Sequence, residues 1–338
     1  MMKDLRPIIW DNEKNQLILI DQRKLPNSLE YFVCKTYEDV AFAIKDMVVR
    51  GAPAIGVSAA YGMALAELNN NNIACGSKRA TKTKGFRLIE KAHNELKNTR
   101  PTAVNLFWAL DRCMEAYKNN KSILNEAKEI HNEDIEICKK IGQIGEKIIN
   151  DGDTILTHCN AGALATSAYG TALSVIRFAH YNNKKISVIA DETRPRLQGA
   201  NLTAYELNYE NIPVKVITDN TAGFLMKMGK IDKIIVGADR ILKDYTVFNK
   251  IGTYSLAVLA KYHNVPFYVG APYSTFDYEN SIEDIIIEER DEKEVKYINN
   301  INIMPEGVSV YNYAFDSTPA ELITGIITEK EIIYPNKK

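Results

Sequence analysis

The spacing of apolar residues changes near residue 150, and this change divides the chain into two predicted parts. In the first part apolar residues recur every three or four positions, which is typical of amphipathic helices. The predicted helices span residues 36–50, 54–66, 86–97, 101–117 and 122–149. Before them, short apolar runs at 7–10, 17–20 and 31–34 predict a small antiparallel strand set.

The second part reads differently. β-rich runs at 154–158, 185–191, 214–219, 232–239 and 265–272 alternate with helical stretches at 163–180, 200–209, 221–229 and 252–263. Such alternation predicts a parallel sheet with helical crossovers. We therefore predict an α/β protein. A mostly helical N-terminal domain, residues 1–150, carries the small antiparallel strand set, and a C-terminal Rossmann-like parallel sheet domain spans 151–338.

Two stretches fall outside this pattern. Residues 69–84 are polar and basic, so they form either an anion-binding loop or a solvated connection between helices, and the general polarity of surface loops favours the connection. From residue 288 onward, the pattern predicts a loop followed by a terminal element.

Composition and charge narrow the function classes. The 338 residues include 42 basic and 43 acidic ones, a net charge of −1, which does not favour nucleic acid as a partner. The N-terminus has no apolar signal-peptide core, so a cytoplasmic protein is expected. The uncharged stretch 154–176 contains His158, Asn160 and glycines, which argues against a membrane span.

The five cysteines and five histidines do not form a metal-binding spacing. No CxxC or HxxxH occurs, so we expect no metal and free thiols that mostly fill the core. Cys159 differs by its position, since it follows an apolar run and precedes a helix. Thiols at a helix N-terminus are pushed toward the thiolate, although a neighbouring carboxylate would oppose this.

Acidic residues follow three of the predicted parallel strands. Asp191, Asp219 and Asp239 end their runs, and Cys159 follows the first run. Parallel strands point their carboxyl ends to one edge, which is the ligand-binding edge of this architecture. Asp191 and Asp219 could instead cap the following helices, and for Asp219 the two roles are equally favoured. Asp239 lies between an apolar strand and Arg240, and capping does not explain a carboxylate at that position.

Cationic or polar residues stand at several predicted helix starts, where free N–H groups favour anions. These are Arg50-Gly51-Ala52, Arg100, Arg194, Arg196, Gln198 and Asn249-Lys250. With no phosphate-binding GxxxxGK[ST] motif, they indicate a small phosphorylated ligand. The absence of GxGxxG after the first strand argues against a dinucleotide, and we expect no cofactor.

Eight blocks in this order resemble the methylthioribose-1-phosphate isomerase family, within the superfamily that includes regulatory subunits of initiation-factor exchange complexes. They are RGAPAIGVSAAYG, RPTAVNLFWAL, THCNAGALAT, DETRPRLQGA, TDNTAG, VGADRI, NKIGTYSLAVLA and FDSTPAELITGIIT. The resemblance implies an aldose–ketose isomerase of methionine salvage, with a sugar-phosphate substrate and a homodimeric assembly. It makes Cys159 the catalytic thiol and Asp239 the proton donor. The implied substrate contacts are Arg50, Gly51, Ala52, Arg100, Gln198, Asn249 and Lys250.

The chain departs from the family pattern at two places. Residues 242–248, LKDYTVF, replace a small-residue stretch with Asn-Gly-Asp, and Asn312-Tyr313 replaces Asn-Pro. The first departure adjoins Asn249 and Lys250, so it bears on substrate preference.

The implied chemistry sets requirements for the site residues. An acid must protonate the ring oxygen of the sugar, a role expected of Asp239 if apolar burial raises its pKa. The hydrogen then passes from C2 to C1, either through an enolate-type intermediate with Cys159 as proton relay or by hydride shift.

Several alternatives remain open at this level. Within enzymes, 5-deoxyribose-1-phosphate and ribose-1,5-bisphosphate isomerases would share Cys159 and Asp239. A non-catalytic regulatory subunit on the same fold should lack both residues. The simplest alternative is an α/β scaffold without catalytic activity, in which Cys159 only fills space in the core.

Overall fold

The computed structural model describes residues 5–73, 78–100 and 103–337 and divides the chain into two compact units. One unit comprises residues 4–138 and 163–170, and the other comprises 1–3, 139–162 and 171–338. We call them the N-terminal and C-terminal units. The division falls inside a long helix, ahead of the boundary expected at residue 150, and assigns the short segment 163–170 to the N-terminal unit.

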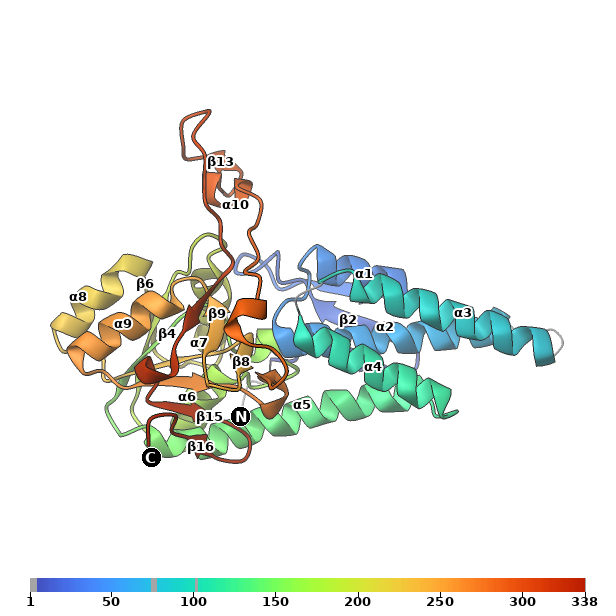
Figure 1. The fold of residues 1–338 in the computed structure, drawn as a ribbon, viewed down its shortest axis with the longest axis horizontal. Helices are drawn as coiled ribbons and strands as arrows, with labels where there is room; N and C mark the ends of the chain where they lie inside the picture. The colour runs from blue at the N-terminus through green and yellow to red at the C-terminus, as the bar shows by residue number, and fades with distance from the viewer. Residues whose placement is uncertain (1–4, 74–77, 101–102, 338) are drawn as a thin grey trace. The chain divides into compact units, whose positions relative to one another are not determined.

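The N-terminal unit combines an antiparallel sheet with a group of helices (Figure 1). The strands, in sheet order, are β1 (Ile8–Asp11), β2 (Gln16–Ile20) and β3 (Tyr31–Cys34). The helices are α1 (Tyr37–Lys45), α2 (Ala52–Ile73), α3 (Lys78–Lys97), α4 (Val104–Lys118) and α5 (Ile123–Gly145). Thr36 caps α1, because its side chain accepts the N–H of Asp39 in a capping box.

The prediction that residues 69–84 form a connection between helices is wrong about the length of that connection. Helix α2 continues to Ile73 and α3 begins at Lys78, so most of this polar stretch is helical. Helix propensity explains the error, since Lys and Arg favour helices as readily as surface loops. Cys75, expected as a free thiol, and Pro101, expected to open a helix, lie outside the described residues.

The main sheet of the C-terminal unit has the order β16-β15-β10-β7-β4-β5-β6 among the described residues. Its strands are β4 (Thr154–Thr157), β5 (Ser187–Asp191), β6 (Val214–Ile217), β7 (Lys233–Val236), β10 (Phe267–Gly270), β15 (Gly325–Ile327) and β16 (Ile332–Ile333). All neighbouring pairs are parallel except β15 with β16. The predicted parallel sheet is confirmed, because each of its five expected runs contains a strand.

The helices between these strands begin later than the sequence pattern predicts. They are α6 (Ala172–Tyr181), α7 (Ala204–Tyr209), α8 (Ala222–Lys227) and α9 (Thr253–His263), with a π-helix at Gly199–Thr203 before α7. Residues 163–171, expected in the first helix, form a short 3-10 turn and irregular backbone instead.

A second sheet has no counterpart in the sequence prediction. Its order is β11 (Phe276–Asp277), β8 (Arg240–Leu242), β9 (Val247–Lys250) and β14 (Phe315–Thr318). The chain after residue 288 therefore supplies strands to both sheets, and is more than the loop and terminal element expected. It also forms α10 (Lys293–Lys296), β12 (Tyr297–Ile298) and β13 (Ile301–Asn302), which project as an arm (Figure 1).

No helix among the described residues combines the length and apolar character that a bilayer crossing requires.

Candidate active site

The strand order of the main sheet places Cys159 and Asp239 beyond the ends of two adjacent strands. From β4 the chain proceeds to β5 and β6 on one side, then returns to β7 on the other side of β4. The reversal therefore lies between β4 and β7, where Leu156 pairs with Ile234. Open α/β sheets bind ligands at this reversal, beyond the carboxyl ends of the strands. Cys159 follows the end of β4 by two residues and Asp239 follows the end of β7 by three.

Cys159 has a left-handed backbone, with φ 62°, and is half-buried. Non-glycine residues seldom adopt this conformation. Two threonine hydroxyls hold it: the N–H of Cys159 donates to Thr193 Oγ1 at 2.8 Å, and Thr203 Oγ1 donates to the Cys159 carbonyl at 2.6 Å. The residue that carries the thiol is therefore held by hydrogen bonds at both its backbone N–H and its carbonyl. Neither threonine was singled out from the sequence, because β-strand ends and helix starts carry no local mark of such a contact.

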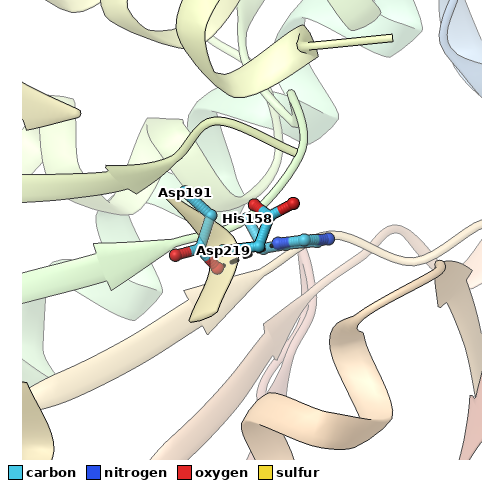
Figure 2. A group of neighbouring side chains, drawn as sticks. All are labelled: His158, Asp191 and Asp219. Atoms are coloured by element: carbon cyan, nitrogen blue, oxygen red, sulfur yellow. Dashed lines mark hydrogen bonds and ion pairs between the residues drawn. The ribbon is translucent and has the colours of Figure 1, made fainter. Parts of the chain in front are cut away.

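The side chain before Cys159, His158, belongs to a group at the ends of β4, β5 and β6 (Figure 2), in which His158 and Asp191 are buried and Asp219 is half-buried. His158 Nδ1 lies 2.9 Å from Asp191 Oδ2, and His158 Nε2 donates to the carbonyl of Ile251 at 2.8 Å. Asp219 accepts the N–H groups of Thr193 and Arg194, each at 2.7 Å. Asp191 therefore pairs with a histidine, and Asp219 holds the loop after β5; neither caps the helix that follows it.

The protonation of the His158–Asp191 pair follows from its geometry. A carbonyl only accepts hydrogen bonds, so Nε2 carries a hydrogen and the remaining proton lies between Nδ1 and the carboxylate. Burial lowers the pKa of His158, but the hydrogen bond and charge of Asp191 outweigh this and raise it. Burial also raises the pKa of Asp191, against the effect of the imidazole. Because the pKa of each partner is raised, the pair retains a shared proton.

The same three side chains lie close enough to be compared with a metal site, since their ligand atoms fall within 4.8 Å of one another. Their hydrogen bonds do not fit that role. The 2.9 Å between Nδ1 and Oδ2 leaves no room for an ion between them, and Nε2 already donates to a carbonyl. Both Asp219 oxygens accept backbone N–H groups. This group is built to share a proton and to hold a loop.

Asp239 lies between β7 and β8 and is partly exposed, so the full apolar enclosure expected for it is not present. Its N–H donates to the carbonyl of Phe248 at 2.9 Å, which fixes it against β9. The neighbouring Arg240 turns to Asp277, with Nη1 at 2.8 Å from Oδ2. Asp239 also acts on Arg290: burial lowers the pKa of that guanidinium, Glu288 raises it most, and Asp239 adds to the rise.

Asn249 and Lys250 end β9 and are both buried. Asn249 Nδ2 donates to Thr253 Oγ1 at 2.9 Å. Lys250 Nζ donates to the carbonyl of Ala314 at 2.8 Å and lies 4.5 Å from the ring centre of Phe315. A cation held by a carbonyl and an aromatic face is preorganised to meet an anion.

The start of α9, next to Lys250, is not the open anion site that the sequence indicated. Asp316 accepts the N–H groups of Gly252 and Tyr254 at 2.7 and 3.1 Å, so two of the amides expected to meet phosphate are occupied. Burial raises the pKa of Asp316 although these hydrogen bonds oppose it. The family departure at 242–248 forms the end of β8, the hairpin turn and the start of β9.

Gln198 directly precedes the π-helix and is 6% exposed. Its Oε1 is buried and has no hydrogen-bond partner within the described part of the chain. A buried acceptor without a partner is costly, and a ligand hydroxyl at this position would satisfy it. The two arginines nearby point elsewhere: Arg194 Nη2 donates to the carbonyl of Val295 at 2.9 Å and Arg196 pairs with Glu294 at 2.7 Å.

The remaining candidates belong to the N-terminal unit. Arg50 and Gly51 directly precede α2, Ala52 begins it, and Arg100 lies between α3 and α4. Gly51 has φ 101°, and a Cβ there would lie 2.4 Å from Ala165 backbone, so only glycine fits. The starts of α2 and α4 lie side by side, because a Cβ on Gly56 would reach within 2.7 Å of the Asn105 carbonyl. Arg50 and Arg100 are both half-buried.

Comparison with known proteins gives one family for most of the chain. The family model described as "Initiation factor 2 subunit family" matches residues 48–335. The chain is 76% identical over 337 residues to a Methanocaldococcus jannaschii protein whose name, methylthioribose-1-phosphate isomerase, is a provisional assignment, covering 100% of this chain and 98% of that one. It is 54% identical over 347 residues to the methylthioribose-1-phosphate isomerase of Thermoanaerobacter sp., again covering 100% and 98%.

Two solved structures share the fold over nearly the whole chain. The 5-methylthioribose 1-phosphate isomerase of Pyrococcus horikoshii OT3 matches with a TM-score of 0.90 and 44% identity, covering 99% of this chain and 94% of that one. The translation initiation factor eIF-2B, subunit delta, from A. fulgidus matches with a TM-score of 0.86 and 46% identity, covering 98% and 96%. These two proteins are named for different activities on one architecture.

Proposed function

We propose that this chain, which belongs to the initiation factor 2 subunit family, is an aldose–ketose isomerase that converts 5-methylthioribose 1-phosphate to 5-methylthioribulose 1-phosphate in methionine salvage. The observation that carries the proposal is the position of Cys159 and Asp239 beyond adjacent strands β4 and β7, at the reversal of the main sheet. The names of the relatives at 76% and 54% identity support the same reaction.

Asp239 is proposed as the general acid. Because C1 carries the phosphate, the ring cannot open as a free hemiacetal, so a proton must be delivered to the ring oxygen as its bond to C1 breaks. Asp239 is partly exposed, and its backbone is tied to β9 beside Asn249 and Lys250. A carboxyl group so held can meet a substrate atom and be reprotonated by solvent.

Cys159 is proposed as the proton relay. Its sulfur takes the proton from C2 and returns it to C1. The O2 hydroxyl then loses its proton as the C2 carbonyl forms, which balances the proton given to the ring oxygen. The left-handed backbone and the two threonine contacts of Cys159 support a role that needs a fixed direction of the thiol. The net reaction is an internal redox exchange between C1 and C2, so it needs no redox cofactor.

Substrate contacts are proposed for the residues named by the family resemblance. They are Arg50, Gly51, Ala52, Arg100, Gln198, Asn249 and Lys250. The buried cation of Lys250 suits the phosphate, and the unpartnered Oε1 of Gln198 suits a sugar hydroxyl. Nucleic acid is not proposed as a partner, in keeping with the net charge of −1.

We also propose a homodimer in the cytoplasm. Apolar side chains of α8, of its C-cap residue and of α9 are exposed at i, i+4 spacing: Phe224, Met228, Tyr254, Val258 and Tyr262. The two helices pack against each other near Gly223 and Leu259 and lie side by side in Figure 1. Exposed apolar stripes on neighbouring helices support an interface with a second copy. Among the described residues, no disulfide involves Cys34, Cys113, Cys138 or Cys159, and this supports a reducing compartment.

A second candidate of another class is a regulatory subunit, because the A. fulgidus protein at 46% identity is named as a subunit of a translation initiation factor. The presence of both Cys159 and Asp239 speaks for the enzyme. Isomerases acting on 5-deoxyribose 1-phosphate or ribose 1,5-bisphosphate are not favoured, because the curated relatives carry the methylthioribose name.

The test is ketose formation from 5-methylthioribose 1-phosphate, with the two rival sugar phosphates assayed in parallel. We expect Cys159→Ala and Asp239→Asn each to lower kcat by about 10²- to 10⁴-fold, the usual contribution of an acid–base group. Asp232→Asn, at an exposed position just before β7, and Cys34→Ala, in β3, serve as matched controls and should retain activity. Full turnover in both site variants would refute the assignment, and a wild-type chain inactive on all three sugars would favour the regulatory subunit.

A further inference from the structure

The backbone of Cys159 is held by side chains and not by a sheet ladder. Strand β4 ends at Thr157, two residues earlier, and Cys159 then takes its left-handed conformation. Its N–H and its carbonyl both bond to buried threonine hydroxyls, at 2.8 and 2.6 Å. Because the directions of N and C around Cα fix the direction of Cβ, these two contacts determine the direction in which the thiol side chain leaves the backbone.

Thr193 forms the first contact, and its own backbone and hydroxyl are held by further hydrogen bonds. Its hydroxyl accepts from Cys159 and donates to the carbonyl of Asp191 at 3.0 Å, so its single hydrogen is used. Thr193 is 0% exposed and has φ 64°, an outlier for a β-branched residue. Asp219 Oδ1 accepts its N–H at 2.7 Å and holds it in this conformation. The strand ends of β5 and β6 are thereby connected to the backbone of Cys159.

Thr203 forms the second contact, from the last residue of the π-helix. Its hydroxyl donates to the Cys159 carbonyl and accepts from Asn160 Nδ2 at 3.2 Å, and the residue is 0% exposed. Asn160 Nδ2 also donates to Glu206 Oε1 at 2.6 Å. Short π-helical segments occur often at functional sites. Here the last residue of the segment contacts Cys159.

We propose that Thr193 and Thr203 are positioning residues that hold Cys159 in its left-handed conformation and so aim its thiol. This inference rests on the proposed function, since it assigns to the two hydroxyls the orientation of the proposed proton relay. Neither threonine touches the reacting atoms. Their contribution is to keep the sulfur at one position during proton transfer, a step that is sensitive to displacements of about 1 Å.

The experiment compares Thr193→Val and Thr203→Val, which keep the shape and lose the hydroxyl, with Thr193→Ser and Thr203→Ser, which keep it. Two readouts are used on the full chain: steady-state kinetics of ketose formation, and the iodoacetamide alkylation rate of Cys159, followed by peptide mass spectrometry. We expect each valine variant to lower kcat by about 10- to 100-fold with little change in KM, because the misplacement affects the chemical step. Alkylation of Cys159 should become faster, and the serine variants should restore both values toward wild type.

Thr328→Val is the matched control. Thr328 is also 0% exposed, and its hydroxyl also donates to a backbone carbonyl, that of Glu331 at 2.7 Å, but it lies far along the chain, after β15. Its substitution should leave kcat and alkylation unchanged. Equal losses in Thr328→Val, or wild-type kcat and alkylation in both valine variants, would overturn the proposal.

If Thr193→Val does not fold, Thr203→Val decides the question alone, because it removes the contact to the carbonyl of Cys159. The alkylation readout needs no sugar substrate. A wild-type chain without isomerase activity would therefore refute the proposed function, while unaltered alkylation in the valine variants would separately refute the positioning role.

Discussion

His158 and Asp191 form a buried pair directly behind the proposed relay residue, with Nδ1 2.9 Å from Oδ2 and side chains only 2% and 1% exposed. Removing one partner of a buried ion pair leaves the other uncompensated, so Asp191→Asn should lower the free energy of unfolding by about 3–5 kcal/mol. Because the pKa of His158 is raised, the stabilisation is fully present below the ordinary pKa of 6.5 and is lost as pH rises through the folded value. The difference in the free energy of unfolding between wild type and Asp191→Asn should therefore become smaller at alkaline pH. Urea unfolding measures this difference.

A second buried pair provides the control for this pH dependence. Lys233 Nζ lies 2.6 Å from Asp153 Oδ2 at the other end of β7. The deficit of Asp153→Asn, measured over the same pH range, is the reference for a buried pair that contains no imidazole. A pH-independent deficit in Asp191→Asn would contradict the shared proton.

The relay role of Cys159 predicts exchange of the C2 hydrogen with solvent. The residue is half-buried, so a proton on its sulfur can exchange before it returns to C1. In deuterium oxide the ketose product should carry deuterium at C1, measured by proton NMR. Complete retention of the substrate hydrogen would instead indicate a direct hydride shift, in which Cys159 has another role.

Lys250 should determine affinity for the phosphate. A charge-assisted hydrogen bond contributes about 1.5–3 kcal/mol, so Lys250→Met should weaken product binding by about 10- to 100-fold in calorimetry. Lys261→Met, on the exposed face of α9, is the control and should bind normally. The melting temperature must be compared as well, because Lys250 also donates to Ala314. Unchanged affinity in a folded Lys250→Met would exclude the phosphate contact.

Asp134 predicts a pH dependence within the N-terminal unit. It lies in α5, accepts the N–H of Ser167 at 2.6 Å, and burial raises its pKa from 3.8 to about 6. The folded state therefore favours the protonated form, and the stability this contributes is present below pH 3.8 and is lost as pH rises through about 6. Relative to Asp134→Asn, the wild type should lose about 3 kcal/mol between these limits.

The measurement is chemical unfolding of both proteins across this pH range. Parallel stability curves for wild type and Asp134→Asn would contradict the raised pKa.

The homodimer predicts a solution mass of about twice the chain mass of 38.1 kDa. Phe224→Glu combined with Tyr262→Glu should shift the protein to monomer, because charges at the centre of an apolar interface are strongly unfavourable. Tyr311→Glu, at an exposed tyrosine beyond β13, should leave the mass unchanged. Light scattering after size exclusion measures all three, and a wild-type mass near 38.1 kDa would contradict the dimer.

Local spacing was enough to predict five of the seven strands that the described residues form in the main sheet, but not β15 and β16. The runs that became β4, β5, β6, β7 and β10 are short, apolar and bounded by turn residues, and a buried parallel strand needs little more. Cys159 and Asp239 could be nominated because they follow such runs. The second sheet was missed, because β8, β11 and β14 have only two to four residues and their pairing is between distant segments.

What the sequence determined by itself is therefore the class of fold, the succession of strands and the residues to suspect. The tertiary structure alone decided that β7 lies against β4, that His158 shares a proton with Asp191, and that Asp316 occupies the start of α9. It alone also brought Thr193 and Thr203 to Cys159 across 34 and 44 residues of chain. The physical reason is the distance along the chain over which each signal acts. Periodicity indicates which face of a single element is buried, whereas strand order and side-chain partners depend on how segments distant in sequence pack together.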